Sequence, residues 1–372
     1  MVAGLSPSET MWRPGMSERK AAPFGNRDQR AAPHVRRASI SVIVPTCDRP
    51  ELLARALSSV LAQSFEDWEC VVVNDAPAAR PSVDALLLRL GDARISAYHN
   101  EVNKGVAAAR NAGIVRTTGR YLAFLDDDDY WLPDHLSRVF VTHEASRKPI
   151  LIYTDFIQQW EGGIVAPRLT TAKPPPDDVT RGLLQGTYNI VTMSTVSFSR
   201  SCIDDVGLFD PNLKTGQDWD FYLRASTRYR FVHLERYSVV YYNHFQHRLT
   251  SDYLTRLSSL SVVIDKWKLD ATFLRNKTRF WKYMALDDMI YASSKKDIIG
   301  KYKALTYFFS FPAPFTSPMV LVKLLVVAVL PYPLYSAIVR RCTRDREDAA
   351  RRLLDTVKIP EPSHSLPGDA GN

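Results

Sequence analysis

Cysteine is scarce in this chain of 372 residues, and the spacing of the few cysteines excludes two ways of stabilising a small domain. The four cysteines lie far apart and include no C-x-x-C pair; they are Cys47, Cys70, Cys202 and Cys342. Neither a disulfide framework nor a structural zinc site is therefore expected. This cysteine usage fits a reducing cytosol, so we expect a cytoplasmic protein.

Long apolar runs are missing as well. Charged residues and prolines are scattered through residues 1–37, which leaves no apolar core for a signal peptide. We expect these residues to form a disordered basic leader. The stretch Met319–Leu330 is apolar apart from Lys323, but it is shorter than the roughly 20 residues that a membrane-spanning helix needs.

The C-terminal region combines this apolar stretch with positive charge, because Arg340, Arg341 and Arg344 follow it. Residues 313–345 are therefore predicted to associate with the inner face of a membrane, as an interfacial helix whose arginines lie among the headgroups. A buried core helix and a tilted or re-entrant span remain alternatives. Residues 346–372 are predicted to be a disordered tail.

The net charge of +8 does not indicate a nucleic-acid partner. The excess is concentrated in the first forty residues and after Ser293, whereas the middle of the chain is nearly balanced. No recognition-helix or zinc-finger pattern accompanies the charge. Anionic phospholipid or phosphate groups suit such basic flanks better.

What the chain does contain is an alternation of strand and helix patterns. Short β-branched runs predict strands, and apolar residues at three- and four-residue steps predict helices. The predicted strands are Ile40–Val44, Trp68–Val73, Arg94–Tyr98, Tyr121–Leu125 and Met193–Ser199, and the predicted helices are Pro50–Gln63, Val83–Leu90, Gly105–Val115 and Gln217–Ser226. The pattern weakens between Gly162 and Gly186, where we expect a mobile loop, and becomes helical after Tyr253. This alternation predicts an α/β fold with parallel crossovers.

Acidic residues follow the ends of three predicted strands. Asp48 and Asp75 come after the first and second strands, and the run Asp126–Asp129 comes after the fourth. Ligands bind at the carboxyl ends of parallel strands, so we expect the three acidic loops to share one rim.

The run Asp126–Asp129 is the most unusual tetrapeptide in the chain. Four adjacent carboxylates repel one another, so they are either solvated or gathered around a cation. Their flanks, Phe124-Leu125 and Tyr130–Pro133, are too apolar for a solvated acidic tail. Hard oxygen ligands suit Mg²⁺ or Mn²⁺, and the pair Asp126 and Asp128 could reach one ion.

Several motifs, taken in order, carry a family resemblance. They are Ser41–Pro50, Ser59–Phe65, Val73–Asp75, Asn103–Gly113, Phe124–Asp129, and Gly207–Asp210 followed by Gln217–Asp220. The chain resembles the family-two inverting glycosyltransferases of the GT-A fold, and the likeness covers Ser39–Ser251. The resemblance implies an α/β fold in residues 38–255, with a mixed, mainly parallel Rossmann-like sheet flanked by helices, and a helical C-terminal extension in residues 256–312.

The resemblance also implies roles for individual residues. The residues expected to bind the nucleotide-sugar donor are Pro45, Thr46, Asp48, Asp75, Lys104, Arg110, Asp126 and Asp127. Those expected to hold Mg²⁺ or Mn²⁺ are Asp126, Asp128 and His247. Asp218 is expected to be the general base that takes the proton of an acceptor hydroxyl.

The residues themselves leave simpler roles open for three of these positions. Asp75 could cap the next turn, and Arg110 could pair with an aspartate of the rim. Asp218 could cap its helix or pair with Arg224, and Asp220 is a second candidate for the base. His244 competes with His247, and a surface or structural role is open for both.

The expected function is transfer of a sugar from a nucleotide-diphosphate sugar to a saccharide or lipid-linked acceptor, in polysaccharide or glycolipid biosynthesis. Two residues depart from the common family pattern, because Asn74 and Gln217 stand where acidic residues are frequent. They could tune the preference for the nucleotide or the acceptor. A nucleotidyltransferase and an inactive nucleotide-sugar-binding scaffold subunit are the competing hypotheses.

Overall fold

The computed structural model describes residues 38–160, 165–168, 178–188, 190–244, 259, 262–269, 273 and 276. The chain divides into two units, Met1–Arg36 and Arg37–Asn372, and all described residues belong to the second. The predicted leader, the predicted membrane segment and the predicted tail lie outside the described residues, as does most of the predicted helical extension. Among the residues that are described, no helix has the length and apolar character needed to cross a bilayer.

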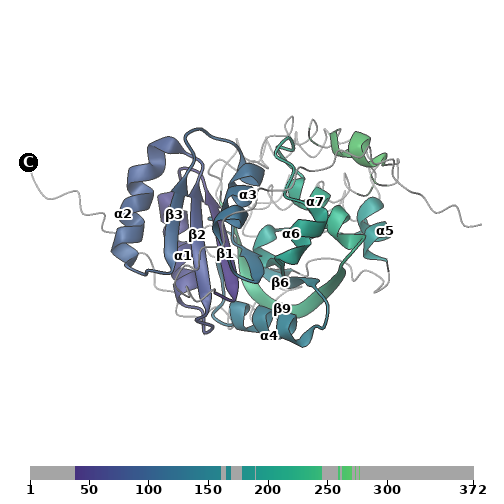
Figure 1. Ribbon diagram of the computed structural model, residues 1–372, viewed down its shortest axis with the longest axis horizontal. Coiled ribbons are helices and arrows are strands. Elements are labelled where there is room, and N and C mark those ends of the chain that lie inside the picture. Colours follow the sequence, from purple (N-terminus) through teal and green to yellow (C-terminus); the bar gives the residue numbers. More distant parts are fainter. Residues whose placement is uncertain are drawn as a thin grey trace, which may run out of the picture. The chain divides into compact units, whose positions relative to one another are not determined.

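The first half of the sheet is parallel and follows the sequence prediction closely. Its strands are β1 (Ile40–Thr46), β2 (Trp68–Asn74), β3 (Ile95–His99) and β4 (Tyr121–Phe124), and its helices are α1 (Pro50–Leu61), α2 (Arg80–Leu90) and α3 (Val106–Arg116). Strand β2 pairs with β1 and β3, and β1 pairs with β4, in parallel register throughout. Figure 1 shows these strands side by side.

The second half makes the sheet mixed, as predicted. Its strands are β5 (Tyr130–Trp131), β6 (Ile150–Trp160), β7 (Val165–Arg168), β8 (Val196–Ser199) and β9 (Arg230–Asn243), and its helices are α4 (His135–Ala145), α5 (Val179–Leu184), α6 (Ser201–Val206) and α7 (Gln217–Ser226). The strand order is β3-β2-β1-β4-β8-β6-β9-β5, with β7 paired to β6. Strand β8 is antiparallel to both β4 and β6, whereas β6 and β9 are parallel.

The structure differs from the sequence prediction mainly in this second half. The sequence did not predict α4, β6 or β9, and the segment expected to be a mobile loop between Gly162 and Gly186 contains β7 and α5. Residues Met193–Thr195, predicted to begin a strand, form a 3₁₀ turn before β8. In β6, the pairing with β9 shifts register around Asp155, which interrupts the regular alternation that sequence patterns detect.

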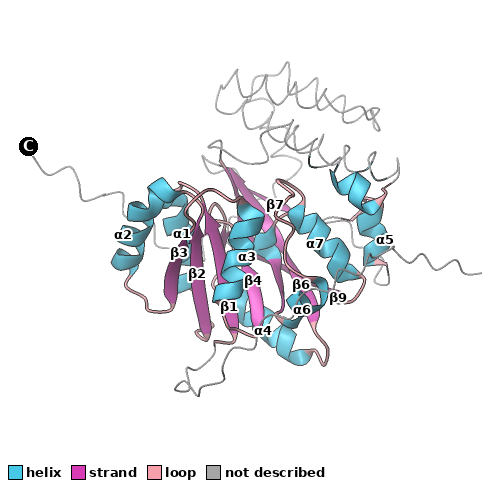
Figure 2. Ribbon diagram, turned by 45° about the horizontal axis from the view of Figure 1, so that its top comes forward, coloured by secondary structure: helices cyan, strands magenta, loops and turns pink. Residues whose placement is uncertain are grey.

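Each face of the parallel strands packs against its own core. Ile43 of β1 and Val71 of β2 belong to a buried cluster with α3, while the neighbouring residues Val42 and Val72 belong to a cluster with α1 and α2. This follows from the two-residue period of a strand, which sends successive side chains to opposite faces. In Figure 2, helix α3 lies in front of the strands. A sheet covered by helices on both faces explains why its strands read as continuous apolar runs.

Helix α3 lies very close to the sheet. A Cβ atom built on Gly113 would lie 2.5 Å from Cγ2 of Ile43, so only glycine fits at this point of the helix. This close approach fixes α3 against β1.

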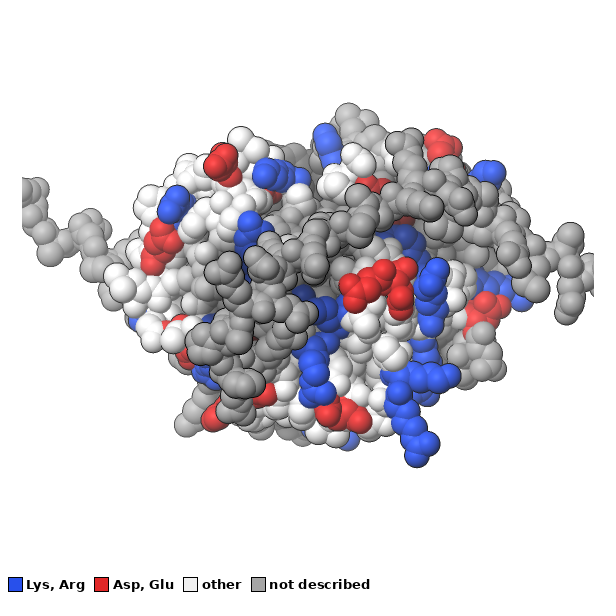
Figure 3. Space-filling model, in the orientation of Figure 1, with Lys and Arg blue, Asp and Glu red and all other residues white. Residues whose placement is uncertain are grey.

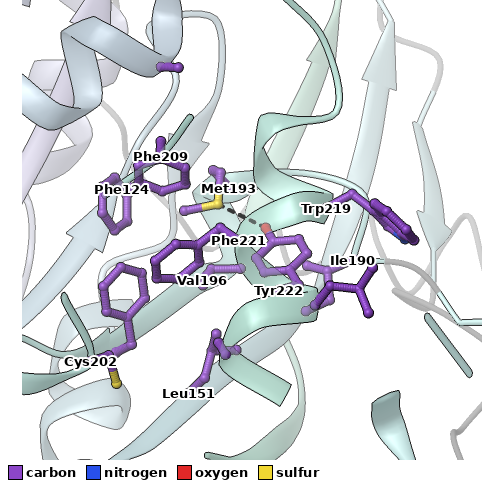
Figure 4. Packing of buried hydrophobic residues seen from close by; sticks show 14 of the residues in the cluster. Phe124, Leu151, Ile190, Met193, Val196, Cys202, Phe209, Trp219, Phe221 and Tyr222 are labelled. Atoms are coloured by element: carbon purple, nitrogen blue, oxygen red, sulfur yellow. Dashed lines mark hydrogen bonds between the residues drawn. The ribbon is translucent and has the colours of Figure 1, made fainter. Parts of the chain in front are cut away.

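An aromatic cluster packs between α7 and the second half of the sheet. Phe209 stacks on Phe221 with ring centroids 4.8 Å apart, and Phe124 meets Phe209 edge-on at 5.7 Å. Figure 4 shows these rings together with Tyr222, whose hydroxyl donates to the sulfur of Met193 at 2.8 Å. Aromatic pairs of this kind stabilise a core beyond their buried area. They anchor α7 to the end of β4.

Candidate active site

The strand order places the candidate site between β1 and β4. The chain leaves β1 for β2 and β3 on one side and then crosses to β4 on the other side of β1. In such a sheet, the crossover opens a crevice at the carboxyl ends of the two central strands, where ligands bind. The loop from Cys47 to Arg49 follows β1, and the run Asp126–Asp129 lies just beyond β4.

Two of the four aspartates point into the protein, and Asp127 is the first of them. Its side chain is fully buried, accepts a hydrogen bond from Thr46 Oγ1 at 2.7 Å and forms an ion pair with Arg49. Burial raises the pKa of Asp127 to about 7, against the opposing effect of the Arg49 charge. Asp127 and Thr46 therefore join the ends of β4 and β1 to each other.

Asp129 is the second buried aspartate. It accepts hydrogen bonds from Ser194 Oγ at 2.6 Å, from Thr192 Oγ1 at 3.0 Å and from the backbone N–H of Tyr242 at 3.1 Å. Burial raises its pKa well above the usual range, and the neighbouring aspartate charges act in the same direction. Asp129 thus joins the end of β4 to β9 and to the turn before β8.

Asp126 and Asp128 are the two partly exposed members of the run. The Asp126 side chain is 26% exposed and accepts a hydrogen bond from Arg110 Nη2 at 2.6 Å. The Asp128 side chain is 14% exposed and lies 3.1 Å from Arg49 Nη1 and 3.0 Å from His244 Nε2. Two arginines, Arg49 and Arg110, therefore offset part of the repulsion expected among the four carboxylates.

The exposed pair fits a divalent cation shared with phosphate. Among the described residues, no group of three or more His, Cys, Asp and Glu side chains is arranged to hold a metal ion. Mg²⁺, however, typically takes one or two carboxylates and completes its shell with water and substrate phosphates. Oδ2 of Asp126 has no hydrogen-bond partner among the described residues, and Asp128 lies two residues away. The donor set thus fits a hard cation that also binds a phosphorylated ligand.

His247, the predicted histidine ligand, lies outside the described residues, which end at position 244 in this part of the chain. The structure instead places His244 beside Asp128, with its Nδ1 buried and without a partner among the described residues. His247 as a metal ligand stays a prediction.

Arg110 connects the two sides of the site. It lies on α3, its exposed fraction is 4%, and its Nε and Nη1 atoms have no hydrogen-bond partner among the described residues. Burial lowers the pKa of Arg110, but the charges of Asp126 and Asp218 outweigh this effect and raise it. The pairing with a rim aspartate, left open by the sequence, is therefore present. Two buried guanidinium nitrogens, Nε and Nη1, therefore have no partner among the described residues.

Asp75 holds the turn that leads into α3. Its carboxylate accepts hydrogen bonds from Asn100 Nδ2 at 2.8 Å, from the Lys104 N–H at 2.9 Å and from the Gly105 N–H at 2.7 Å. Gly105 has a positive φ of 83°, a conformation that favours glycine. Asp75 thus has a structural role, but at the loop before α3 rather than at the next turn, where Asn74 accepts from the Ala76 N–H. Contact of Asp75 with a nucleobase stays a prediction.

The remaining predicted donor residues lie at the same edge. Pro45 and Thr46 are buried at the end of β1, and Asp48 is exposed with a φ of 55°. The side chain of Lys104 is exposed just before α3. The structure therefore brings the predicted donor-binding residues of β1, β2, α3 and the aspartate run to one edge of the sheet.

Asp218 lies in the first turn of α7 and is partly exposed, whereas Asp220 is fully buried. Oδ1 of Asp218 accepts a hydrogen bond from the Trp219 N–H at 2.8 Å. Arg224 pairs with Asp220, with Nε 3.1 Å from Oδ2, rather than with Asp218. Of the two candidates for the base, Asp218 is the one that solvent and a substrate can reach.

The structure also identifies residues that the sequence analysis did not assign. Arg49 pairs with Asp127 and Asp128. It lies inside the motif Ser41–Pro50, so the sequence could have indicated it as a site residue. Asn111 lies inside another motif and binds the backbone of Phe209 twice, through Nδ2 to the carbonyl at 2.8 Å and through Oδ1 from the N–H at 2.9 Å. These bonds join α3 to the loop before α7. Lys266 and Trp267 contact Asp220 without any sequence signal.

Comparisons with known proteins agree with this fold and identify the family. A model of the family "Glycosyl transferase family 2" matches residues 41–206. WcaA of Escherichia coli strain K12, named as a glycosyl transferase of colanic acid biosynthesis, is 31% identical over 57% of this chain and 75% of its own length. WfgD of Escherichia coli, named as a UDP-Glc:alpha-D-GlcNAc-diphosphoundecaprenol beta-1,3-glucosyltransferase, is 35% identical over 26% of this chain and 38% of its own length.

The solved structure of residues 1–349 of TarS from S. aureus has a similar fold. Its complex with UDP-GlcNAc gives a TM-score of 0.51 at 17% identity, covering 73% of this chain and 80% of that one. The fold is thus that of a GT-A glycosyltransferase. Together with the match to WcaA, these findings show that the chain belongs to glycosyltransferase family 2.

Proposed function

We propose that the chain is a metal-dependent, inverting glycosyltransferase that moves a sugar from a nucleotide-diphosphate sugar to an acceptor hydroxyl. The observation that carries the proposal is the buried Arg110, which donates to Asp126 of the proposed metal pair at 2.6 Å. The charge of Asp218, the proposed base, also raises the pKa of Arg110, so the metal pair and the base lie within electrostatic range of the same arginine. A sugar bound at this place would have its leaving group near Asp126 and its attacking hydroxyl near Asp218.

The donor would bind at the edge formed by β1, β2 and α3. Pro45, Thr46, Asp48 and Asp75 would hold the nucleoside. Lys104 and Arg110 would lie near the diphosphate, because positive charge and the N-terminus of α3 both favour phosphate. The nitrogens Nε and Nη1 of Arg110, which have no partner among the described residues, support this arrangement, since buried donors normally have one. Asp127 is buried beneath this edge and would act by orienting Thr46 and Arg49.

Asp126 and Asp128 would hold Mg²⁺ or Mn²⁺. When bound, the ion neutralises negative charge on the departing diphosphate, which is a main requirement of the reaction. The buried Asp127 and Asp129 fix the backbone between and beside these two residues. The pair is therefore preorganised before a donor arrives.

Asp218 would accept the proton of the acceptor hydroxyl as this oxygen attacks the anomeric carbon. Direct displacement by the hydroxyl inverts the configuration at that carbon. Asp220 is unsuited to this task, because its exposed fraction is 0% and both of its oxygens already accept hydrogen bonds.

The acceptor would be a saccharide or a lipid-linked saccharide. The names of WcaA and WfgD support polysaccharide or glycolipid biosynthesis, because colanic acid and a diphosphoundecaprenol-linked sugar are products or substrates of that kind. Peripheral contact with the inner face of a membrane, through residues 313–345, is part of the same proposal.

The test is release of nucleoside diphosphate from a panel of nucleotide sugars with Mn²⁺, for the wild type and for Asp218→Asn. We expect the variant to lose about 10²- to 10⁴-fold in transfer rate, the range for a general base, while binding of the nucleoside diphosphate is retained. Asp204→Asn is the matched control, because Asp204 is an exposed aspartate of α6, away from this network. Normal transfer by Asp218→Asn would exclude the proposed base.

Two further measurements separate the competing hypotheses. Asp126→Asn should abolish most of the stimulation by Mn²⁺, whereas a scaffold subunit would bind donor without turnover by any variant. Formation of a nucleotide sugar from a nucleoside triphosphate and a sugar phosphate would indicate a nucleotidyltransferase instead. Retention of configuration in the product would contradict the direct displacement.

A further inference from the structure

Residues downstream of the segment matched by the family model hold the helix that carries Asp218. Residues 262–267 are helical, and two of their side chains reach Asp220. Trp267 Nε1 donates to Oδ1 of Asp220 at 2.9 Å, and Lys266 Nζ lies 2.8 Å from the same oxygen. Asp220 and Asp218 share the first turn of α7.

The first turn of α7 receives no side-chain cap from the residue that precedes it, although the Asp218 carboxylate itself accepts a hydrogen bond from the Trp219 N–H. Its N-cap residue is Gly216, which has a positive φ of 76° and no side chain to accept hydrogen bonds from the turn. The first backbone N–H groups of a helix lack intrahelical partners, so an uncapped end frays readily. Asp218 would therefore be mobile unless contacts from outside the helix held this turn.

Some of these contacts are ion pairs and hydrogen bonds to Asp220. The Oδ2 atom of its buried carboxylate accepts a hydrogen bond from Arg224, and its Oδ1 atom binds Lys266 and Trp267. Lys266 Nζ also lies 2.8 Å from Oδ2 of Asp210, in the loop before α7. A buried carboxylate is stable only when it is paired in this way. Lys266 thus joins the loop to the helix. Acidic and basic side chains likewise lie next to one another on the face drawn in Figure 3.

Apolar contacts hold the same turn from the other side. The rings of Phe273 and Trp219 lie 5.0 Å apart, and both are buried. In Figure 4, Trp219 lies apart from the stack of Phe209 and Phe221, so Phe273 contacts a face of α7 that this stack does not cover. The Thr215 N–H also donates to Ser259 Oγ at 3.2 Å.

We propose that Lys266 and Trp267 are positioning residues, which fix the first turn of α7 so that Asp218 is directed at the acceptor hydroxyl. The inference rests on the proposed function for the role of Asp218. It assigns part of the active site to residues that follow the family match, on a segment whose sequence carries no chemical motif. Small displacements of a reacting group can lower a rate by about 10²-fold, so such a clamp would matter for transfer.

The experiment uses the full chain with the substitutions Lys266→Met and Trp267→Phe. Both substitutions introduce an apolar side chain that cannot donate a hydrogen bond to Asp220. Lys268→Met is the matched control, because Lys268 is an exposed lysine two residues further on. Lys266→Arg restores the positive charge. Backbone hydrogen exchange over residues 216–222, UDP binding with Mn²⁺, and kcat on the nucleotide sugar that the wild type turns over are measured for each protein.

We expect Lys266→Met to speed exchange in the first turn of α7 and to lower kcat by about 10- to 100-fold, with UDP affinity within about twofold of the wild type. Trp267→Phe should do the same to a smaller extent. Lys266→Arg should recover most of kcat, and Lys268→Met should match the wild type in all three measurements.

Two results would overturn the inference. One is wild-type exchange and kcat in both Lys266→Met and Trp267→Phe; the other is a loss of UDP affinity as large as the loss of kcat. Failure of the proposed function looks different, because then Asp218→Asn would match the wild type in transfer, or no protein would turn over a nucleotide sugar. The exchange measurement would still decide whether the clamp exists.

Discussion

The two halves of the candidate active site are built in different ways. The donor half comprises β1–β4 and α1–α3. Its site residues lie at the ends of adjacent parallel strands, and Asp75 accepts hydrogen bonds from the backbone of the loop before α3. In the acceptor half, which comprises β8, α5–α7 and the described residues from 259 to 276, Asp218 lies on a helix held by side chains from separate segments.

This difference has a consequence for mutations. Strand pairing and burial fix the donor edge, so its buried ion pairs should contribute to stability and, under the proposed function, to donor binding. The acceptor helix depends on a few side-chain contacts, so losing one of them should impair transfer more than donor binding. Each prediction below tests one side of this contrast, from the largest expected effect to the smallest.

The largest effect is expected for Arg49→Met in the donor half. The variant leaves the buried Asp127, with a side chain 1% exposed, without its ion-pair partner. Breaking a buried pair typically costs about 3–5 kcal/mol, and the free energy of unfolding in urea should fall by this order. Affinity for UDP with Mn²⁺ should fall too, because Arg49 also binds Asp128.

The control for this prediction is Arg138→Met. Arg138 pairs with Asp134 at the surface, where both side chains are more than 40% exposed, so the free energy of unfolding should change by less than about 1 kcal/mol. Equal destabilisation by the two substitutions would mean that the buried pair has no special weight in the donor half.

A smaller effect is expected for Arg224→Met in the acceptor half. Arg224 binds the buried Asp220 and donates to the backbone carbonyls of Val206, Gly207 and Leu208. Asp220 keeps Lys266 and Trp267, so we expect a loss of about 2–3 kcal/mol in the free energy of unfolding. The rate of transfer should fall, while UDP affinity stays within about twofold of the wild type.

Arg228→Met serves as the comparison, because Arg228 is exposed just after α7. It should leave stability and transfer unchanged. A parallel loss of UDP affinity and transfer in Arg224→Met would break the contrast between the two halves, since it would couple the acceptor helix to the donor edge.

The smallest effect concerns His143, on α4 and outside both halves. Burial lowers the pKa of His143 to about 3, its ring stacks on Tyr121 at 4.2 Å, and its Nε2 lies 2.9 Å from Ser197 Oγ. In the unfolded chain, His143 binds a proton below pH about 6.5, whereas in the folded chain it does so only near pH 3. Stability should therefore fall as the pH decreases through this window, by at most about 1.4 kcal/mol per unit for this group.

Urea unfolding of the wild type and of His143→Gln between pH 7.5 and pH 5 checks this prediction. The variant should be less stable at pH 7.5, because it loses the stacked ring, but its stability should decrease less steeply with acid. His135, whose pKa burial also lowers to about 3, would maintain part of the slope. Identical slopes in the two proteins would contradict the assignment to His143.

The predictability of the fold also differs between the halves. The donor half was predicted from local patterns, because strands buried on both faces, such as Val42–Val44 in β1, read as apolar runs between amphipathic helices. Outside the donor half, β6 and β9 were not predicted. Strand β9 mixes exposed and buried residues without a strict period, and its partner β6 changes register beside Asp155.

The candidate site follows the same division. The sequence placed Asp75, Arg110 and the aspartate run at one edge because strand ends of a parallel sheet meet there. It singled out Asp126 and Asp128 as the pair that could reach one ion, but it did not show that Asp127 and Asp129 are buried, because all four residues are chemically alike. Only their partners, Arg49 and Ser194 among them, decide which carboxylates are buried.

The sequence by itself determined the family, the parallel core and the edge at which the acidic residues gather, because these depend on local periodicity and on motifs in a fixed order. Tertiary structure decided which aspartates face outward, that Arg110 pairs with Asp126, and that Lys266 binds the turn carrying Asp218. Such contacts join residues far apart in the chain. They depend on the register of β8, β6 and β9, which no local pattern specifies.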